Sequence, residues 1–183
     1  PHFGPVFTNI LLADEINRAP AKVHSALLEA MQEQQVSMGG QSYTLPKPFM
    51  VLATQNPIEY EATYALPEAQ LDRFMLKIVI DYPTQAEGRE ILDASLNYDF
   101  RTVERTINID SLNKLCNIVR KIVIDESIRE YILRIVHASR KPSDYGLSNI
   151  EPMIDYGASP RAATFLAQGS QALAFLNGRE YVT

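Results

Sequence analysis

The sequence has 183 residues, of which 46% are hydrophobic and 21% charged, a composition typical of one large or two small folded domains. The net charge of −5 and the lack of a long Lys or Arg run argue against nucleic acid or a membrane surface as a direct ligand. No apolar run approaches the roughly 20 residues that span a bilayer, and the chain does not open on a signal-peptide pattern. We therefore expect a cytoplasmic protein.

The first third of the sequence predicts a strand, a helix and a hairpin. Residues 9–15, NILLADE, contain a short apolar run typical of a strand covered on both faces of a parallel sheet. Apolar residues recur at helical spacing over 20–33 and predict an amphipathic helix. Residues 36–45 alternate between apolar and polar around Gly39 and Gly40, which predicts a β-hairpin with a tight turn.

Two further strands are predicted before the pattern changes. FMVLAT at 49–54 is a second buried-strand candidate, and it also ends in polar residues. A short helix over PEAQLDRF, residues 67–74, leads to a third strand candidate, MLKIVI at 75–80. The break DYPT then places a domain boundary near residues 82–84.

The second half of the sequence predicts a helical bundle. Apolar residues recur there at spacings of three and four residues. Four segments show this recurrence: TQAEGREILDASL, SLNKLCNIVRKIV, DESIREYILRIVHAS and SPRAATFLAQGSQALAFL. The predicted fold class is thus α/β, with part of a parallel sheet and its helices at 1–82 and an all-α domain at 83–183.

Several reactive or aromatic residues are not assigned a chemical role. Cys116 falls in an apolar pattern and is expected to be a small core residue. His24 and Ser25 are adjacent on the predicted helix, where neighbours point about 100° apart, so we expect both on the helix surface. Tyr60 and Tyr64 lie in the loop IEYEATY, which is a candidate contact site for a partner or a neighbouring subunit.

Polar residues follow both of the first two predicted strands. In open α/β sheets, ligands bind beyond the carboxyl ends of the strands. Asp14 and Glu15 follow the first strand, and their diverging side chains suit separate tasks: Asp14 could hold magnesium while Glu15 activates water. Asn56 follows the second strand and could fix that water against a phosphate. The alternative is that the two carboxylates cap the next helix or face solvent.

The motifs together resemble one protein family. ILLADEINRAP, SALLEAMQE, VLATQNP and LPEAQLDRF occur in this order, and they are similar to the MoxR branch of the AAA+ ATPases over nearly the whole chain. The resemblance implies a partial P-loop NTPase core followed by a helical lid domain. It also implies ATP and Mg²⁺ as cofactors.

The resemblance implies a role for each of five residues. LLADE matches the Walker B element, in which Asp14 positions the magnesium shell and Glu15 is the catalytic base. Asn56 matches sensor 1, and Arg73 in LDRF matches the arginine finger that reaches the ATP of a neighbouring subunit. Arg161 in GASPRA matches sensor 2, and the hairpin matches the pre-sensor-1 insertion.

The chemistry of arginine agrees with the roles that the resemblance implies for Arg73 and Arg161. Its planar, permanently charged fork can grip two phosphate oxygens, and an arginine finger is worth roughly 10³ to 10⁵ in rate. The alternative for Arg73 is a surface ion pair with Asp72 or Glu68. Arg161 follows Ser159, a predicted N-cap, so it lies beside a positive helix end; the alternative is a solvated residue of the first turn.

A phosphate-binding loop is missing. No G-x-x-x-x-G-K-[ST] string occurs in the sequence, so we expect it to begin partway through a longer protein and, on its own, not to hydrolyse ATP efficiently. The family sheet has a further strand between the second and third strands predicted here. Residues 75–80 are therefore expected to pair elsewhere in the chain or between chains.

The resemblance also implies partners. It predicts a ring, usually a hexamer, that remodels a protein client, often together with a von Willebrand factor A-domain partner. A non-hydrolysing nucleotide-sensing scaffold is the first alternative. A nucleic-acid motor is the second, although the acidic balance and the hairpin VSMGGQSYT, which lacks Lys and Arg, argue against it.

Overall fold

The computed structural model describes residues 3–56, 66–97 and 102–183. The loop that contains Tyr60 and Tyr64 lies outside these residues, so its expected contact role stays a prediction. Within the described chain, no helix is both long enough and apolar enough to cross a membrane.

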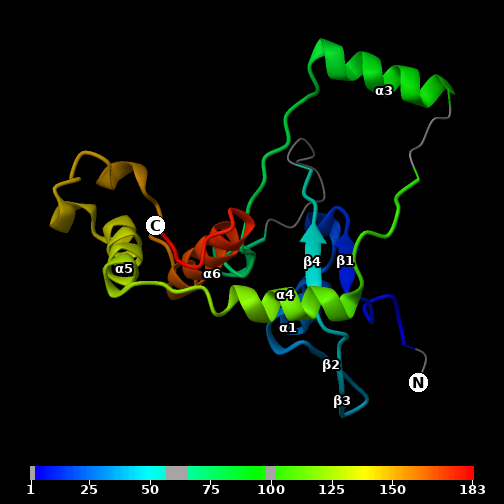
Figure 1. The fold of residues 1–183 in the computed structure, drawn as a ribbon, viewed down its shortest axis with the longest axis horizontal. Helices are drawn as coiled ribbons and strands as arrows, with labels where there is room; N and C mark the ends of the chain where they lie inside the picture. Colours follow the sequence, from blue (N-terminus) through cyan, green and yellow to red (C-terminus); the bar gives the residue numbers. More distant parts are fainter. Residues whose placement is uncertain (1–2, 57–65, 98–101) are drawn as a thin grey trace.

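Two short parallel strands form the sheet that positions the candidate site. β1 (Ile10–Ala13) pairs with β4 (Met50–Ala53), and Leu11 lies opposite Val51 in the register. The strands lie side by side in Figure 1 and point the same way, so their carboxyl ends share one edge. The two strand predictions at 9–15 and 49–54 are confirmed.

One face of this sheet is covered. η1 (Ile16–Arg18), α1 (Ala21–Glu33) and α2 (Glu68–Leu71) surround a cluster built on Ile16, Leu27 and Leu66. The sheet residues that pack against this cluster are Leu11, Ala13, Val51 and Ala53. The opposite face is open, since the side chains of Ile10, Leu12, Met50 and Leu52 are 48–63% exposed. The expectation of burial on both faces is therefore wrong within the described residues.

The predicted hairpin is present. β2 (Gln35–Met38) pairs antiparallel with β3 (Gln41–Thr44), and the hairpin projects away from the sheet in Figure 1. Gly39 and Gly40 both have positive φ, 59° and 79°, which explains why this dipeptide forms the turn.

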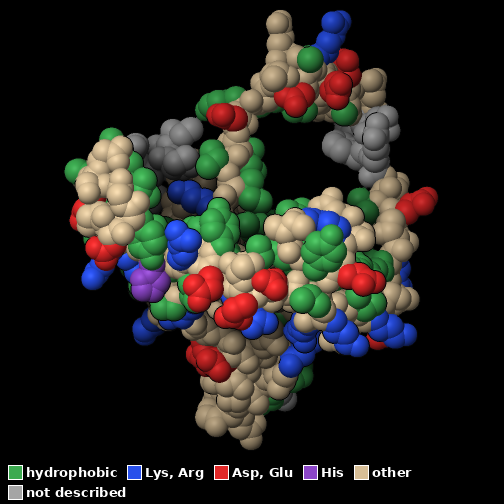
Figure 2. Space-filling model, turned by 60° about the vertical axis from the view of Figure 1, so that its left-hand side comes forward, with side chains coloured by type: hydrophobic (Ala, Val, Ile, Leu, Met, Phe, Trp, Pro, Cys, Tyr) green, Lys and Arg blue, Asp and Glu red, His purple; other side chains and the backbone are tan. Residues whose placement is uncertain are grey.

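The third predicted strand is not formed. Residues 75–80 are extended, but among the described residues no strand pairs with them. Their apolar side chains are 43–89% exposed, and Figure 2 shows such side chains along the connection that rises to α3 (Gln85–Asn97). The strand prediction fails because a β-ladder needs a partner backbone, and residues 3–56, 66–97 and 102–183 place none beside this segment. Pairing between chains stays a prediction.

Three of the four main helices in the second half pack together. α6 (Pro160–Leu176) contacts α4 (Ile109–Val119) and α5 (Glu126–Arg140). α3 contains no buried residue and lies apart in Figure 1, so the bundle prediction holds for three helices and is wrong for α3. The boundary at residues 82–83 stays a prediction.

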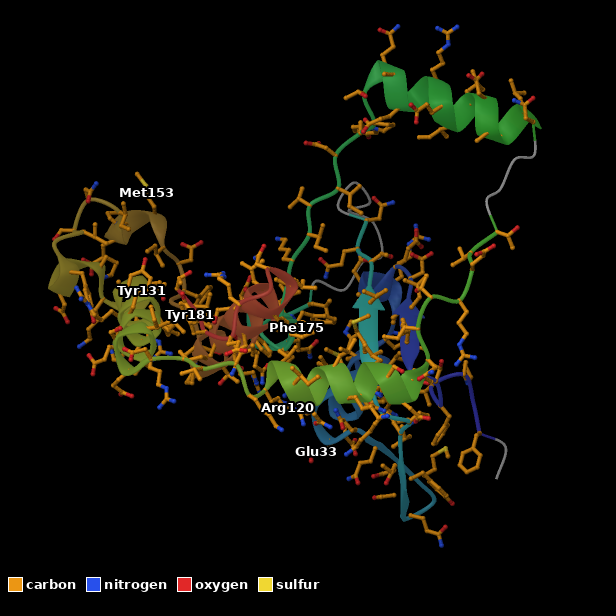
Figure 3. All side chains as sticks on the ribbon, in the orientation of Figure 1. Glu33, Arg120, Tyr131, Met153, Phe175 and Tyr181 are labelled. Atoms are coloured by element: carbon orange, nitrogen blue, oxygen red, sulfur yellow. The ribbon has the colours of Figure 1, made fainter. Side chains whose placement is uncertain are left out.

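Short elements complete the helical half. η2 (Pro142–Tyr145) and η3 (Glu151–Met153) join α5 to α6, and the exposed Met153 marks the outer end of this connection in Figure 3. Val123 forms an isolated parallel bridge with Tyr181, which lies between α5 and α6 in the same view. A second core cluster forms here from Ile122, Ala174 and Val182. Cys116 is only half-buried, less than a core residue would be.

Candidate functional site

The carboxyl edge of the sheet gathers the polar residues that follow β1 and β4. Asp14 and Glu15 come directly after β1, while Thr54 and Asn56 follow β4. Thr54 continues the pairing of the strands, since its N–H donates to the Ala13 oxygen at 3.0 Å. The structure therefore places the three residues predicted here, Asp14, Glu15 and Asn56, at one edge.

Thr54 joins the two carboxylate residues. Its hydroxyl donates a hydrogen bond to Oδ1 of Asp14 and accepts one of 2.8 Å from the backbone N–H of Glu15. Its backbone oxygen accepts from the N–H of Ile16 at 3.0 Å. Sequence reasoning overlooked Thr54, although its position at the end of the second strand could have indicated it. The Asp14–Glu15 step is thus held by one residue of the neighbouring strand.

Glu15 adopts a left-handed backbone conformation, with φ 47° and ψ 49°. For a residue with a Cβ this conformation costs roughly 1–2 kcal/mol, so it persists where surrounding contacts fix it. The carboxylate forms an ion pair of 3.1 Å with Arg18, and both side chains are about half exposed. Glu15 therefore faces solvent, while Asp14 faces Thr54.

Asn17 links η1 to the segment that follows β4. Its side-chain amide donates to the backbone oxygen of Asn56 at 3.4 Å. Asn17 is only 8% exposed, and its Oδ1 is buried without a hydrogen-bond partner among the described residues. A buried amide oxygen of this kind is a site for a water molecule or a ligand donor. Sequence reasoning did not single out Asn17.

His24 is buried, so its predicted position on the helix surface is wrong. It is 2% exposed on the inner face of α1, and its Nε2 lies 2.7 Å from the backbone oxygen of Ile16. A carbonyl oxygen only accepts, so Nε2 carries the proton. The neighbouring Ser25 is exposed as predicted, with its hydroxyl bonded to the Ala21 oxygen.

Arg73 lies just after α2 and, among the described residues, forms no ion pair with the nearby carboxylates of Asp72 and Glu68. Its Nε is buried and has no hydrogen-bond partner among the described residues. Asp72 pairs with Arg161 instead of Arg73, and no pair between Arg73 and Glu68 is formed in the described chain. The alternative considered for Arg73, a surface ion pair with Asp72 or Glu68, is thus not observed among the described residues.

Arg161 lies in the first turn of α6, where Ser159 is the N-cap as predicted. The Ser159 hydroxyl accepts from the N–H of Arg161 at 3.1 Å. The guanidinium Nη1 of Arg161 lies 3.0 Å from Oδ2 of Asp72. This pair brings Arg161 next to the segment that contains Arg73.

The loop before α6 is fixed to the end of α5. The backbone N–H of Ala158 donates to the Ser139 hydroxyl at 2.9 Å, and its oxygen accepts from Nε of Arg140 at 2.6 Å. Gly157 packs so closely that an added Cβ would lie 2.6 Å from Cγ of Arg140. Close packing and two hydrogen bonds therefore place the start of α6.

The donor set fits a magnesium ion better than a transition metal. Among the described residues no group of three or more His, Cys, Asp or Glu could hold a metal. Asp14 and the hydroxyl of Thr54 are hard oxygen donors at one position. Mg²⁺ usually keeps several waters and binds through one or two carboxylates plus substrate phosphates, and the Asp14 carboxylate fits this pattern.

Comparisons with known proteins place both halves of the chain. Residues 1–76 match the ATPase family associated with various cellular activities (AAA), and residues 147–183 match the AAA lid domain. A crystal structure of a candidate ATPase from Cytophaga hutchinsonii is 48% identical with a TM-score of 0.92, covering 98% of this chain and 55% of that one. These matches confirm the predicted α/β fold class with a helical lid.

Curated relatives give the same family. The chain is 45% identical over 179 residues to Chaperone MoxR1 of Mycobacterium tuberculosis, covering 98% of this chain and 47% of that protein. It is 28% identical over 195 residues to Protein MoxR of Methylorubrum extorquens, of which it covers 57%. The chain thus spans about half the length of the curated relatives it matches.

Proposed function

Because the chain belongs to the MoxR family of AAA+ ATPases, we propose that it is the water-activating part of a magnesium-dependent ATPase with chaperone-like action on protein complexes. The observation that supports this most is the joining of Asp14 and Glu15 through Thr54 at the carboxyl edge of the sheet. Ligands of open α/β sheets bind at that edge.

Each residue at the edge has a separate task in hydrolysis. Asp14 holds the magnesium shell, and the ion, when bound, neutralises charge on the phosphate oxygens. Glu15 accepts a proton from water while the water oxygen bonds to the γ-phosphorus. The bond between the γ-phosphorus and the oxygen that bridges it to the β-phosphorus then breaks, and ADP leaves. Asn56 orients that water. The two carboxylates have different partners, since that of Glu15 pairs with Arg18 and that of Asp14 accepts from Thr54.

Arg73 and Arg161 supply positive charge for the phosphates. Phosphoryl transfer spreads negative charge over the equatorial oxygens, which a guanidinium fork can bind through two donors. We assign Arg73 to the ATP of a neighbouring subunit in a ring, usually a hexamer, and Arg161 to the sensor position. The phosphate-binding loop, whose motif this sequence lacks, is assigned to the remainder of the whole protein.

The partners follow from the same assignment. We propose a protein client for the ring and a von Willebrand factor A-domain protein as a partner, with the cytoplasm as the compartment. The name of Chaperone MoxR1, to which this chain is 45% identical, supports a protein as the client. A nucleic-acid motor is disfavoured because the hairpin residues 35–44 include no Lys or Arg.

Phosphate release by the whole protein tests this function. We expect Glu15→Gln to reduce release at saturating ATP and Mg²⁺ by roughly 10²-fold or more, since a general base typically contributes that much. Binding of a fluorescent nucleotide is expected to persist. The control is Glu33→Gln, which removes an exposed carboxylate at the end of α1, labelled in Figure 3. If wild type and Glu15→Gln are equally inert, the non-hydrolysing scaffold is the better assignment.

A further inference from the structure

Asp72 lies where two distant parts of the chain meet. Its Oδ2 accepts a hydrogen bond of 2.7 Å from the Ser159 hydroxyl and one of 3.0 Å from Nη1 of Arg161. Asp72 follows the last residue of α2, and its backbone N–H donates to the oxygen of Glu68, the first residue of that helix. One carboxylate oxygen therefore ties the segment before Arg73 to the start of α6.

The ion pair between Asp72 and Arg161 is partly open to solvent. The Asp72 side chain is 25% exposed and that of Arg161 is 41% exposed. Partly exposed pairs of this kind contribute modestly, because water screens them. A phosphate carries more negative charge than a carboxylate and offers more acceptor oxygens, so it can compete for the same guanidinium.

Ser159 keeps the start of α6 in place while Arg161 changes partner. Its hydroxyl both caps the helix and donates to Asp72, so this contact does not depend on the guanidinium. Ala158, just before the cap, donates a hydrogen bond to Ser139 and accepts one from Arg140. These contacts hold the backbone of Arg161, so its side chain can leave Asp72 for a phosphate by rotation alone.

We propose that Asp72 is a positioning residue that holds Arg161 until the γ-phosphate of ATP takes its place, and that Asp72 thereby lowers the preference of the site for ATP over ADP. This inference rests on the proposed ATPase function. ADP lacks the γ-phosphate, so with ADP the Arg161–Asp72 pair stays intact. With ATP, part of the binding energy is spent on separating the pair.

The test is a comparison of affinities in the whole protein. Asp72→Asn removes the charge but leaves an amide oxygen that can accept from Ser159. We expect this variant to bind a non-hydrolysable ATP analogue with Mg²⁺ about two- to fivefold more tightly, the size of a partly exposed ion pair, and ADP unchanged. Asp72→Ser, which also removes the charge, should give the same ratio, and a thermal melt checks that each variant is folded.

Two controls separate this role from a structural one. Asp155→Asn removes an exposed carboxylate from the loop before α6 and should leave both affinities unchanged. In an Arg161→Ala background, Asp72→Asn should no longer alter the ATP-to-ADP ratio, because the residue acts through Arg161. An equal change for both nucleotides, or an effect that persists without Arg161, would overturn the inference.

Failure of the role proposed for Asp72 can be told apart from failure of the proposed ATPase function. If wild type hydrolyses ATP and Glu15→Gln does not, the ATPase assignment stands whatever Asp72→Asn does. A wild type that binds neither nucleotide overturns the assignment, and this inference with it.

Discussion

His24 on α1 donates a 2.7 Å hydrogen bond from Nε2 to the backbone oxygen of Ile16, the residue that follows Glu15. The N–H of Ile16 in turn donates to the Thr54 oxygen at 3.0 Å. The turn that carries Glu15 is therefore held from the helix on one side and from the second strand on the other.

Removing this imidazole should loosen the turn. We expect His24→Ala to lower the free energy of unfolding by about 1–3 kcal/mol, because a buried carbonyl loses its donor, and to slow phosphate release. His24→Gln should restore much of both, since its amide N–H can reach the same oxygen. Urea unfolding and a phosphate assay measure the two effects. Ser25→Ala, at the exposed neighbour, is the control, and an equal loss in that variant would contradict the role of His24.

The Thr54 hydroxyl is expected to organise the magnesium side of the site. Thr54→Val keeps the shape but removes the partner of Asp14 and of the Glu15 N–H, at a cost of about 0.5–1.5 kcal/mol in stability. The Mg²⁺ concentration for half-maximal hydrolysis should rise, and Thr54→Ser should reverse the rise. Thr44→Val, at the exposed end of β3, is the control. An unchanged Mg²⁺ dependence in Thr54→Val would remove Thr54 from the site.

Gly157 should tolerate no side chain. An added Cβ would lie 2.6 Å from Cγ and 2.7 Å from Cα of Arg140, so we expect Gly157→Ala to destabilise the fold by about 1–3 kcal/mol. Gly88→Ala is the matched control: its Cβ would meet nothing within 4 Å in α3, and the helix should gain about 0.5–1 kcal/mol. Thermal unfolding of both variants gives the comparison, and similar shifts in both would contradict the packing argument.

The start of α5 should weaken in acid. Asp125 caps this helix, and hydrogen bonds from Ser127 lower the pKa of its carboxyl. Because the folded pKa lies below the unfolded one, the stabilisation is present above the unfolded value and is lost as the pH falls through the folded value. Asp125→Asn retains the cap without the charge, so its melting temperature should depend less on pH in acid. Parallel curves for the two proteins would contradict this.

Local sequence signals predicted much of the fold. The apolar runs of β1 and β4, the Gly39-Gly40 turn and the Ser159 cap each depend on a few consecutive residues, and all are present. The same is true of the edge position of Asp14, Glu15 and Asn56, which follows from parallel strands alone.

Contacts between distant residues could not be predicted in this way. Asp72 meets Arg161 across 89 residues, and the burial of His24 depends on how α1 packs beneath the sheet. Residues 75–80 have the composition of a strand, yet a strand also requires a neighbouring backbone, which composition does not encode. Thr54 could not be singled out from the sequence, because hydroxyl residues are common at strand ends and only its partners in the structure distinguish this one.

We propose that Glu15 of one subunit and Arg73 of its neighbour act on the same nucleotide, and mixing two inactive variants tests this shared site. Glu15→Gln and Arg73→Ala should each be inactive alone in the whole protein. In random mixed rings, about a quarter of the interfaces regain an intact Glu15 opposite an intact Arg73, so phosphate release should recover to roughly that fraction of wild type. No recovery at any mixing ratio, with mixed rings shown to form, would contradict a shared site between subunits.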